Sequence, residues 1–336
     1  MKDIEFVYLT QKEVEKSGLT MKLVVETVEE VFRLHAENKV IVPSKVVLDL
    51  DEKRKGRINA MPAYVGGKFN VCGIKWIAGF PKNPIKYGMP RATGLLILND
   101  SETGFPLAIM DCTLISAMRT GAVTGVGAKY LARPDSEVVA MIGAGVQART
   151  QLLALLEVLK NLKEVRVYDI RKEASIKYSE EMSEKTGLKI VPVDTPKDAV
   201  VGADIIITVT VADEPIVKDK WVKEGSFFSH VGSYQEEEYE VVLHSDKIVV
   251  DEWEHVLHRG TPILAKMYKE GVIKDEDIYA NLGDIVIGRK PGRENPKERI
   301  FFAPIGMGSE DVAVGYIIYK NAKEKKLGVT LKLFGR

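Results

Sequence analysis

The chain has few of the features that mark secreted, disulfide-bonded or membrane proteins. Cys72 and Cys112 are its two cysteines among 336 residues, and their separation fits neither a disulfide framework nor a metal-ligand motif. We expect two buried thiols. No apolar run approaches the roughly 18 residues of a membrane span, and the first residues, Met1 to Glu5, lack a secretory signal. We therefore expect a soluble, cytoplasmic protein.

The chain also lacks net charge. Lys plus Arg and Asp plus Glu both total 48, so the formal charge is zero. Such a balance provides no field that would attract nucleic acid or an anionic membrane, and we expect a small-molecule partner. With 336 residues and 45% hydrophobic residues, the chain is long enough for two domains.

Hydrophobic periodicity predicts three helices and one sheet outside the centre of the chain. Thr20 precedes an amphipathic helical pattern from Met21 to Asn38. Short apolar runs from Lys45 to Ile109, separated by Gly, Pro and Asn, predict a mostly antiparallel sheet. Small residues between Cys112 and Leu131 predict a closely packed helix that bridges the domains, and a final helix from Ser309 to Lys326 is expected to return to the first domain.

Apolar strands alternate with helical segments between Glu137 and Asp251, which is typical of a parallel sheet covered on both faces. The strands predicted there are Val138 to Ile142, Val165 to Tyr168, Ile205 to Val209, Ser226 to His230 and Lys247 to Val250. The charged stretch from Glu236 to Glu238 is interpreted as a solvated loop or helix start.

The first of these strands leads into a glycine motif, Gly143-x-Gly145-x-x-Ala148, and then into a helix. Gly143 can make the tight turn, and Gly145 lets the backbone approach a pyrophosphate. The next strand ends at Asp169, where a carboxylate can accept hydrogen bonds from a ribose. The residues predicted to bind this dinucleotide are Gly143, Ala144, Gly145, Val146, Gln147 and Asp169. The alternative is a glycine turn that binds no nucleotide.

Asp169 also bears on which nicotinamide cofactor is bound. Its carboxylate would repel a ribose phosphate, which favours NADH over NADPH. Arg171 and Lys172 weaken this preference, because either side chain can turn toward such a phosphate, and NADPH stays open as the alternative.

Seven segments together resemble the ornithine cyclodeaminase and mu-crystallin family. They are Asn59–Ala63, Gly73–Trp76, Thr103–Leu107, Ser116–Ala122, Gly143–Arg149, Asn281–Gly288 and Glu310–Ala313. The resemblance covers nearly the whole chain. It implies an α/β homodimer with a Rossmann-type, doubly wound parallel sheet in residues 119–305. Residues 1–118 and 306–336 would form a split α+β domain for substrate binding and dimerisation.

The resemblance also implies chemistry at a carbon–nitrogen bond next to a carboxylate. Family members include cyclodeaminases, an alanine dehydrogenase and ketimine reductases. Lys45, Arg119 and Arg57 match positions that hold the substrate carboxylate, for which Arg offers a bidentate partner; the spacing of Arg57 to Met61 differs from that in some relatives. Lys75 matches a position at the reacting carbon and is the predicted catalytic residue; it interrupts an apolar strand, where an unpaired charge is costly. A surface charge is the alternative for each cation.

Residues after later strands complete the expected site. Thr210 and Val211 are expected beside a ribose of the cofactor, and Ser233 and Met307 beside the nicotinamide, with Gly306 at the substrate. By the family resemblance, cyclodeaminases and the alanine dehydrogenase have an aspartate, the presumed catalytic base, at the position where this chain has Ser233. A serine is a poor base, whereas reducing a protonated imine requires only binding, hydride and a proton source. This departure favours a reductase.

The sequence therefore predicts an NADH-preferring oxidoreductase that reduces a cyclic ketimine, Δ1-pyrroline-2-carboxylate, to L-proline. Ornithine cyclodeamination, alanine dehydrogenation and a non-catalytic, mu-crystallin-like binding protein are the alternatives. The spacing of Asp251, His255 and His258 does not provide the three ligands of a metal site. We therefore expect these residues to be structural and expect no metal site. Glu310 and Asp311 resemble family residues but are also the carboxylates that a helix start favours.

Overall fold

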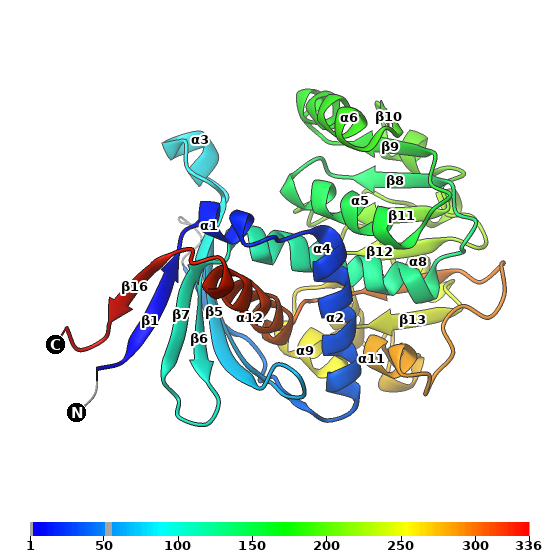
Figure 1. Ribbon diagram of the computed structural model, residues 1–336. Helices are drawn as coiled ribbons and strands as arrows, with labels where there is room; N and C mark the ends of the chain where they lie inside the picture. Colours follow the sequence, from blue (N-terminus) through cyan, green and yellow to red (C-terminus); the bar gives the residue numbers. More distant parts are fainter. Residues whose placement is uncertain (1–2, 51–55, 336) are drawn as a thin grey trace. The chain divides into compact units, whose positions relative to one another are not determined.

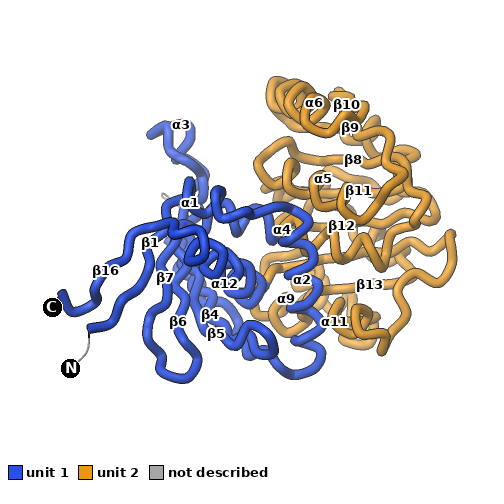
Figure 2. The backbone as a smooth tube through the Cα atoms, viewed as in Figure 1, with its two compact units in different colours: residues 1–119, 307–336 blue, residues 120–306 orange. Residues whose placement is uncertain are grey.

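The computed structural model describes residues 3–50 and 56–335 (Figure 1). It divides into two compact units, coloured separately in Figure 2. Unit 1 contains residues 1–119 and 307–336, and unit 2 contains residues 120–306. The divisions lie one residue beyond the expected boundaries at 118 and 305.

A mostly antiparallel sheet forms the centre of unit 1, as the short apolar runs predict. Its order is β16-β1-β7-β6-β5-β4-β2, with β3 paired to β4, and the β1–β7 pair is parallel. The strands are β1 (Glu5–Leu9), β2 (Val40–Ile41), β3 (Val46–Asp49), β4 (Arg57–Val65), β5 (Val71–Gly79), β6 (Ala92–Asp100), β7 (Pro106–Asp111) and β16 (Val329–Lys332).

Two long helices complete the core of unit 1. The predicted amphipathic helix is α2 (Met21–Ala36), whose Thr20 side chain accepts a hydrogen bond from Leu23 N at 3.3 Å. The final helix, α12 (Gly308–Glu324), packs on α2 and on β4, β5 and β6. Gly315 permits this approach, because a Cβ there would lie 2.1 Å from Leu96 Cδ2. The shorter helices are α1 (Gln11–Lys16) and α3 (Asn83–Tyr87).

Unit 2 is built on an eight-stranded parallel sheet, which confirms the predicted Rossmann-type fold. Its order is β10-β9-β8-β11-β12-β15-β13-β14. The five predicted strands are present as β8 (Val138–Ile142), β9 (Glu164–Tyr168), β11 (Ile205–Thr208), β12 (Phe227–His230) and β13 (Lys247–Val250). Three strands were not predicted: β10 (Lys189–Pro192), β14 (Ala280–Asn281) and β15 (Ile300–Ala303).

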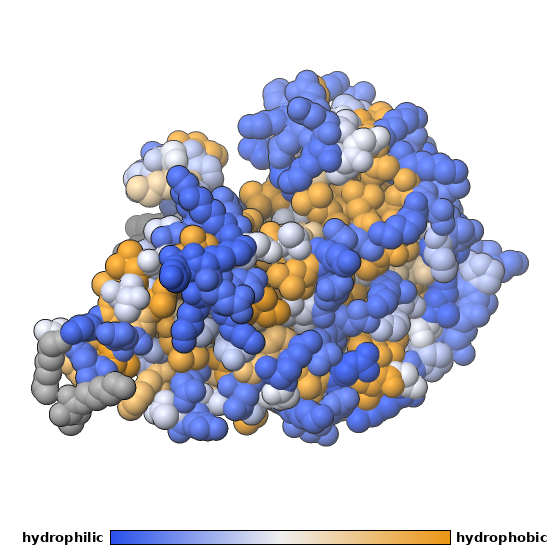
Figure 3. Space-filling view, viewed as in Figure 1, coloured by the Kyte–Doolittle hydropathy of each residue, from blue (hydrophilic) through white to orange (hydrophobic). Residues whose placement is uncertain are grey.

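Helices separate most of these parallel strands along the chain. They are α5 (Val146–Val158), α6 (Lys172–Thr186), α7 (Pro196–Val200), α8 (Tyr239–Leu243), α9 (Trp253–Arg259), α10 (Ile263–Lys269) and α11 (Leu282–Val286), with 3-10 turns at Asp219–Trp221 and Asp275–Asp277. Helix α6 presents a hydrophilic surface in Figure 3. Two glycines in α4 (Thr113–Leu131) permit close packing on α5, since a Cβ at Gly121 would crowd Thr150 O and one at Gly125 would lie 3.1 Å from Ala154 O.

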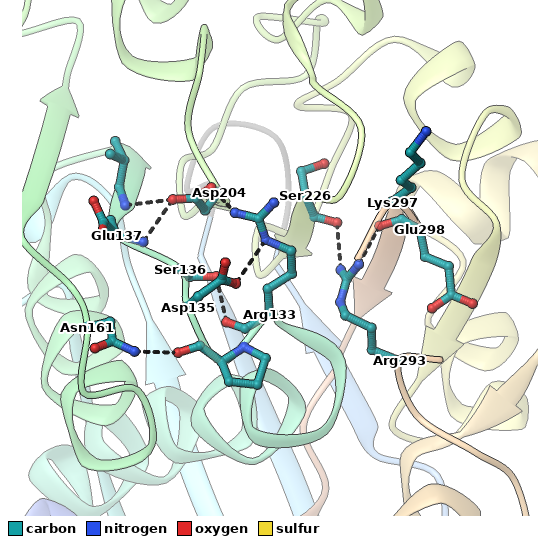
Figure 4. A network of polar contacts seen from close by, with 12 residues as sticks. Arg133, Asp135, Ser136, Glu137, Asn161, Asp204, Ser226, Arg293, Lys297 and Glu298 are labelled. Carbon is teal, nitrogen blue, oxygen red and sulfur yellow. Dashed lines mark hydrogen bonds and ion pairs between the residues drawn. The ribbon is translucent and has the colours of Figure 1, made fainter. Parts of the chain in front are cut away.

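A polar network ties together the amino ends of the parallel strands (Figure 4). Asp204, just before β11, accepts hydrogen bonds from Glu137 N at 2.8 Å and Val138 N at 2.9 Å, and pairs with Arg133 at 2.8 Å. Arg293 donates to the carbonyls of Ser226 and Glu298 at 3.1 and 2.6 Å, and its burial lowers its pKa to about 10. This end of the sheet is therefore fixed by structural contacts, which leaves the carboxyl end for a ligand.

Both cysteines are free thiols. Cys112 is buried, as predicted, but Cys72 is half-buried, so the prediction is wrong there. It lies in β5 between the buried Val71 and Gly73, so its side chain points to the other face of the sheet. Within the described ranges, no helix combines the length and apolar character needed to cross a membrane.

Candidate functional site

The glycine turn lies between β8 and α5, as the sequence predicts. Gly143 has a φ of +105°, which strongly favours glycine, and a Cβ there would crowd Val209 O and Thr210 Cγ2 at 3.1 Å. Gly145 is the N-cap of α5, and nothing lies within 4 Å of a Cβ built on it. Val146 and Gln147 form the first turn of the helix. The open backbone at a helix start suits a pyrophosphate.

Asp169 follows β9 and contacts the glycine turn directly. Its Oδ2 accepts a hydrogen bond from Ala144 N at 2.9 Å, and its Oδ1 accepts one from Arg171 N at 2.9 Å. A carboxylate has about four acceptor positions, so capacity remains for ribose hydroxyls. The Arg171 side chain is exposed, with its Nε 3.7 Å from Asp169 Oδ1. These residues fit the adenosine end of a dinucleotide.

Arg149 is a contributor to this turn that the sequence analysis did not single out. Its guanidinium donates to the carbonyls of Ala144 at 2.9 Å and Gly145 at 3.0 Å. It also pairs with Glu181 at 2.6 Å and lies over the ring of Tyr178, 5.3 Å from the centroid. By holding these carbonyls, Arg149 fixes the orientation of the turn's peptide groups. Its position at the end of the Gly143–Arg149 segment, which resembles the family motif, could have identified it from the sequence.

Two loops at the carboxyl end of the sheet hold further expected cofactor residues. Thr210 follows β11 and donates from both its N and its Oγ1 to Glu236 Oε1, each at 2.6 Å. Val211 beside it is exposed, and Ser233 lies partly buried in the bend after β12. The interpretation of residues 236–238 as a solvated segment is wrong for Glu236 and Glu237. Both are fully buried, and their carboxylates contact Thr210 and His230 respectively.

The connection from β15 to α12 contains Gly306 and Met307. Gly306 has a φ of +73°, and its N donates to Asp251 Oδ2 at 2.5 Å; Ile305 N donates to the same oxygen at 2.8 Å. Asp251 therefore has the structural role expected of it. Gly306 is the last residue of unit 2, and Met307, the N-cap of α12, is the first of this segment of unit 1.

Four buried charged residues form a cluster in unit 1. Lys75 Nζ lies 2.6 Å from Asp311 Oδ2 and donates to Ser116 Oγ at 3.2 Å. Arg119 bonds Glu310 Oε2 at 2.7 Å and Asp311 Oδ1 at 3.2 Å. The helix-dipole interpretation of Glu310 and Asp311 was incomplete, because both are fully buried counter-charges. Two cations and two carboxylates thus balance where isolated charges would be costly.

The surroundings of this cluster change its proton equilibria. Burial lowers the pKa of the Lys75 amine below its ordinary value of 10.5, Arg119 lowers it further, and Asp311 opposes both. Burial and the Asp311 charge raise the pKa of the nearby Cys112 thiol to about 12. The thiol therefore stays protonated near neutral pH, and Lys75 is the group whose proton is easier to release than in water.

Lys45 and Arg57 lie at the starts of two neighbouring strands, outside the four-residue cluster. Lys45 directly precedes β3, and Arg57 begins β4 opposite Gly79 of β5; both are half-buried. Met61 pairs with Lys75, and alternate residues share a face, so Arg57 and Lys75 project from the same face of the sheet. Arg57 and Met61, the residue paired with Lys75, are four residues apart along β4, which is a distance of about 13 Å. The structure thus brings Lys75 and Arg119 together and places Arg57 further along the same face.

Known proteins resemble this chain over nearly its full length. The family model described as ornithine cyclodeaminase/mu-crystallin matches residues 5–326. The N-((2S)-2-amino-2-carboxyethyl)-L-glutamate dehydrogenase of Staphylococcus aureus is 35% identical over 335 residues, which cover 98% of this chain and 99% of that protein.

Two solved structures have the same fold. One is the Δ1-pyrroline-2-carboxylate reductase of Thermococcus litoralis in complex with NADH and L-proline. Its TM-score is 0.90 at 40% sequence identity, and the match covers 96% of this chain and 99% of the reductase chain. The other is an archaeal alanine dehydrogenase dimer with bound NAD. Its TM-score is 0.89 at 38% sequence identity, and the match covers 98% of this chain and 100% of the dehydrogenase chain. The chain belongs to the ornithine cyclodeaminase/mu-crystallin family.

Proposed function

We propose that this protein reduces a cyclic ketimine carboxylate, Δ1-pyrroline-2-carboxylate, to L-proline with NADH. The protein is an oxidoreductase that acts on carbon–nitrogen bonds. The observation that carries the proposal is the buried Lys75 amine, 2.6 Å from Asp311 and beside Arg119, on the sheet of unit 1. The similarity to the Thermococcus litoralis enzyme, whose complex holds NADH and L-proline, supports the same substrate class.

The reaction needs a hydride at the imine carbon and a proton at the nitrogen. NADH, when bound, supplies the hydride and becomes NAD⁺. The C=N double bond becomes a single bond as the carbon gains a C–H bond from the hydride and the nitrogen gains an N–H bond from the proton; the donor then regains its proton from solvent. Lys75, whose pKa is lowered by burial, gives the proton directly or through an ordered water, and Asp311 holds its amine in place.

The substrate carboxylate requires cationic partners. Arg119 offers a planar, bidentate guanidinium, and it is held by Glu310 and Asp311 rather than left to move. Lys45 and Arg57 would add charge from β3 and β4. Gly306 would border the substrate, where the absence of a side chain leaves room for a ring.

The cofactor is proposed to be NAD(H), with NADH preferred over NADPH. Asp169 is anchored by two backbone amides next to the glycine turn, so its carboxylate would meet a ribose phosphate with like charge. Gly143, Ala144, Gly145, Val146 and Gln147 would hold the pyrophosphate. Thr210, Val211, Ser233 and Met307 would border the nicotinamide riboside, and Arg171 is the residue that could accommodate NADPH.

The protein is further proposed to act as a homodimer, like the archaeal alanine dehydrogenase. The outer face of the unit 1 sheet exposes large apolar side chains, among them Trp76 and the residue opposite it, Leu95. Ile85, in α3, is 92% exposed, and apolar surface is visible around α3 in Figure 3. Exposed apolar patches of this kind mark interaction sites, and a second copy of the chain would cover this one.

Alanine dehydrogenation is the second candidate, because an alanine dehydrogenase of Archaeoglobus fulgidus is 39% identical over 338 residues. Oxidising an amino acid requires a base to take the ammonium proton before hydride leaves. Ser233 occupies the position where the resemblance leads one to expect an aspartate, and a serine is a poor base. Imine reduction is therefore favoured.

The test is a comparison of substrates with the purified protein. Absorbance would follow NADH oxidation with Δ1-pyrroline-2-carboxylate and its six-membered homologue, piperideine carboxylate. Parallel reactions with NAD⁺ would contain L-ornithine, with an ammonia assay, or L-alanine. Rapid imine reduction with little amino-acid oxidation is expected. Ammonia and proline from ornithine, or rapid alanine oxidation without imine reduction, would overturn the proposal.

A further inference from the structure

Two adjacent glutamates in the segment after β12 are equally buried but contact different parts of unit 2. Glu236 and Glu237 both have 0% exposure. Glu237 pairs with His230 Nδ1, at the end of β12, at 2.9 Å. Glu236 instead reaches the loop after β11. Burying two neighbouring carboxylates is costly, so each contact must offset that cost.

One carboxylate oxygen of Glu236 organises the loop after β11. Its Oε1 accepts hydrogen bonds from Thr210 N and Thr210 Oγ1, both at 2.6 Å. The Thr210 hydroxyl in turn accepts from Ala212 N at 3.0 Å. Thr210 also lies against the glycine turn, since a Cβ on Gly143 would approach its Cγ2 to 3.1 Å. The Glu236 contact therefore extends to the residues that shape the dinucleotide turn.

The other oxygen of Glu236 lies under the loop after β12. A Cβ on Gly232 would come within 1.7 Å of Glu236 Oε2, so a side chain at position 232 would displace this carboxylate. Among the described residues, this oxygen has no hydrogen-bond partner, and His230 Nδ1 is 3.6 Å away. The backbone of Glu236 is itself fixed, because its carbonyl accepts from Ile216 N at 2.9 Å and Val217 N at 3.0 Å.

We propose that Glu236 is a positioning residue for the dinucleotide, joining the loops after β11 and β12 at the carboxyl end of the parallel sheet. Ligands of such sheets bind at this end. Residues on both loops, Thr210 and Ser233, belong to the cofactor site that the proposed function assigns, on which this inference rests. Glu236 thereby sets affinity for NAD(H), while Glu237 contributes to folding alone.

The two glutamates provide matched variants for the test. NADH binding would be titrated by fluorescence in the absence of substrate, for the wild type, Glu236→Ala and Glu237→Ala, with thermal unfolding measured in parallel. Both variants should lose stability. Glu236→Ala should weaken NADH binding about tenfold to a hundredfold, as expected for lost hydrogen bonds to a charged group, whereas Glu237→Ala should stay within about twofold.

Milder variants carry the test if the alanine variants do not fold. Glu236→Asp withdraws the carboxylate from Thr210 by one methylene, and Glu237→Asp makes the same change next to it. Glu236→Gln keeps an oxygen that can accept both Thr210 bonds, so it should retain more affinity than Glu236→Asp. At saturating NADH, the KM for the imine should not change in any folded variant.

The outcomes separate this inference from the function on which it rests. Equal weakening of NADH binding by the Glu236 and Glu237 variants, or none by either, would overturn the positioning role while leaving the reductase proposal standing. A wild-type protein that binds no NADH would overturn both. Weakening confined to the Glu236 variants, with Glu236→Gln the least affected, would establish the positioning role.

Discussion

Replacing Lys75 by methionine tests the proton source most directly. Methionine keeps an unbranched side chain of similar volume but removes the amine 2.6 Å from Asp311. If Lys75 supplies the proton, kcat for imine reduction should fall about 10²- to 10⁴-fold, the usual contribution of general acid–base catalysis. NADH binding, measured by fluorescence titration without substrate, should remain within about twofold because Lys75 is not a proposed cofactor ligand.

The same substitution also has a cost in folding. Removing one partner of a buried ion pair destabilises a protein by about 3–5 kcal/mol. The lower end of that range is expected here, since Arg119 Nε stays 3.2 Å from Asp311 Oδ1 and compensates part of its charge. Thermal unfolding should therefore show a lower midpoint, and activity must be measured well below it.

Lys247 provides the control for that loss of stability. It is a buried lysine of unit 2, paired with Glu294 at 2.6 Å and Glu298 at 3.2 Å, and it lies outside the proposed site. Lys247→Met should lower stability but leave kcat nearly unchanged. Retention of full kcat by Lys75→Met, or an equal loss of kcat in both variants, would refute the proposed role of Lys75.

Three further predictions concern the cofactor site and the pH dependence. Asp169→Ser removes the charge that disfavours a ribose phosphate next to Arg171, so the ratio of kcat/KM for NADPH to that for NADH should rise about tenfold. Arg149→Met should weaken NADH binding about tenfold, because the carbonyls of Ala144 and Gly145 lose their donor, whereas Glu181→Gln, which keeps Arg149, should have a smaller effect. Because the pKa of Lys75 is lowered from 10.5, its protonated form is lost earlier as pH rises, so kcat should fall on the alkaline side below pH 10.5; a profile flat up to that pH would contradict the assignment.

The parallel sheet was predictable where strands alternate with helices at short spacing. The strands from Val138 to Val250 follow this pattern, and the glycine turn and Asp169 mark the ends of the first two. β15 (Ile300–Ala303) was not found, because a long segment separates it from β13 although it pairs with both β12 and β13. The insertion of a strand between two earlier ones, out of chain order, leaves no periodic signal in the sequence.

The charged parts of the site were only half predictable. Lys75 stood out because a cation interrupts an apolar strand, and Arg119 because of the family resemblance. Their partners Glu310 and Asp311 lie at the start of α12, where acidic residues are common whether or not they are buried. Glu236 and Glu237 were misread for the same reason: local composition does not reveal buried partners, here Thr210 and His230, that the fold brings to these carboxylates. The partners of these four carboxylates could be identified only from the structure.

The position of α12 has a consequence for synthesis. All strands of the unit 1 sheet except β16 have been made by Asp111, but α12, which covers one face of that sheet, begins only at Gly308, after all of unit 2. Chains fold from the amino terminus as they emerge, so unit 1 must wait with one sheet face uncovered and with Lys75 and Arg119 lacking their counter-charges from α12. A nascent chain stalled before Gly308 should therefore carry a folded unit 2 and a protease-sensitive unit 1 that engages chaperones.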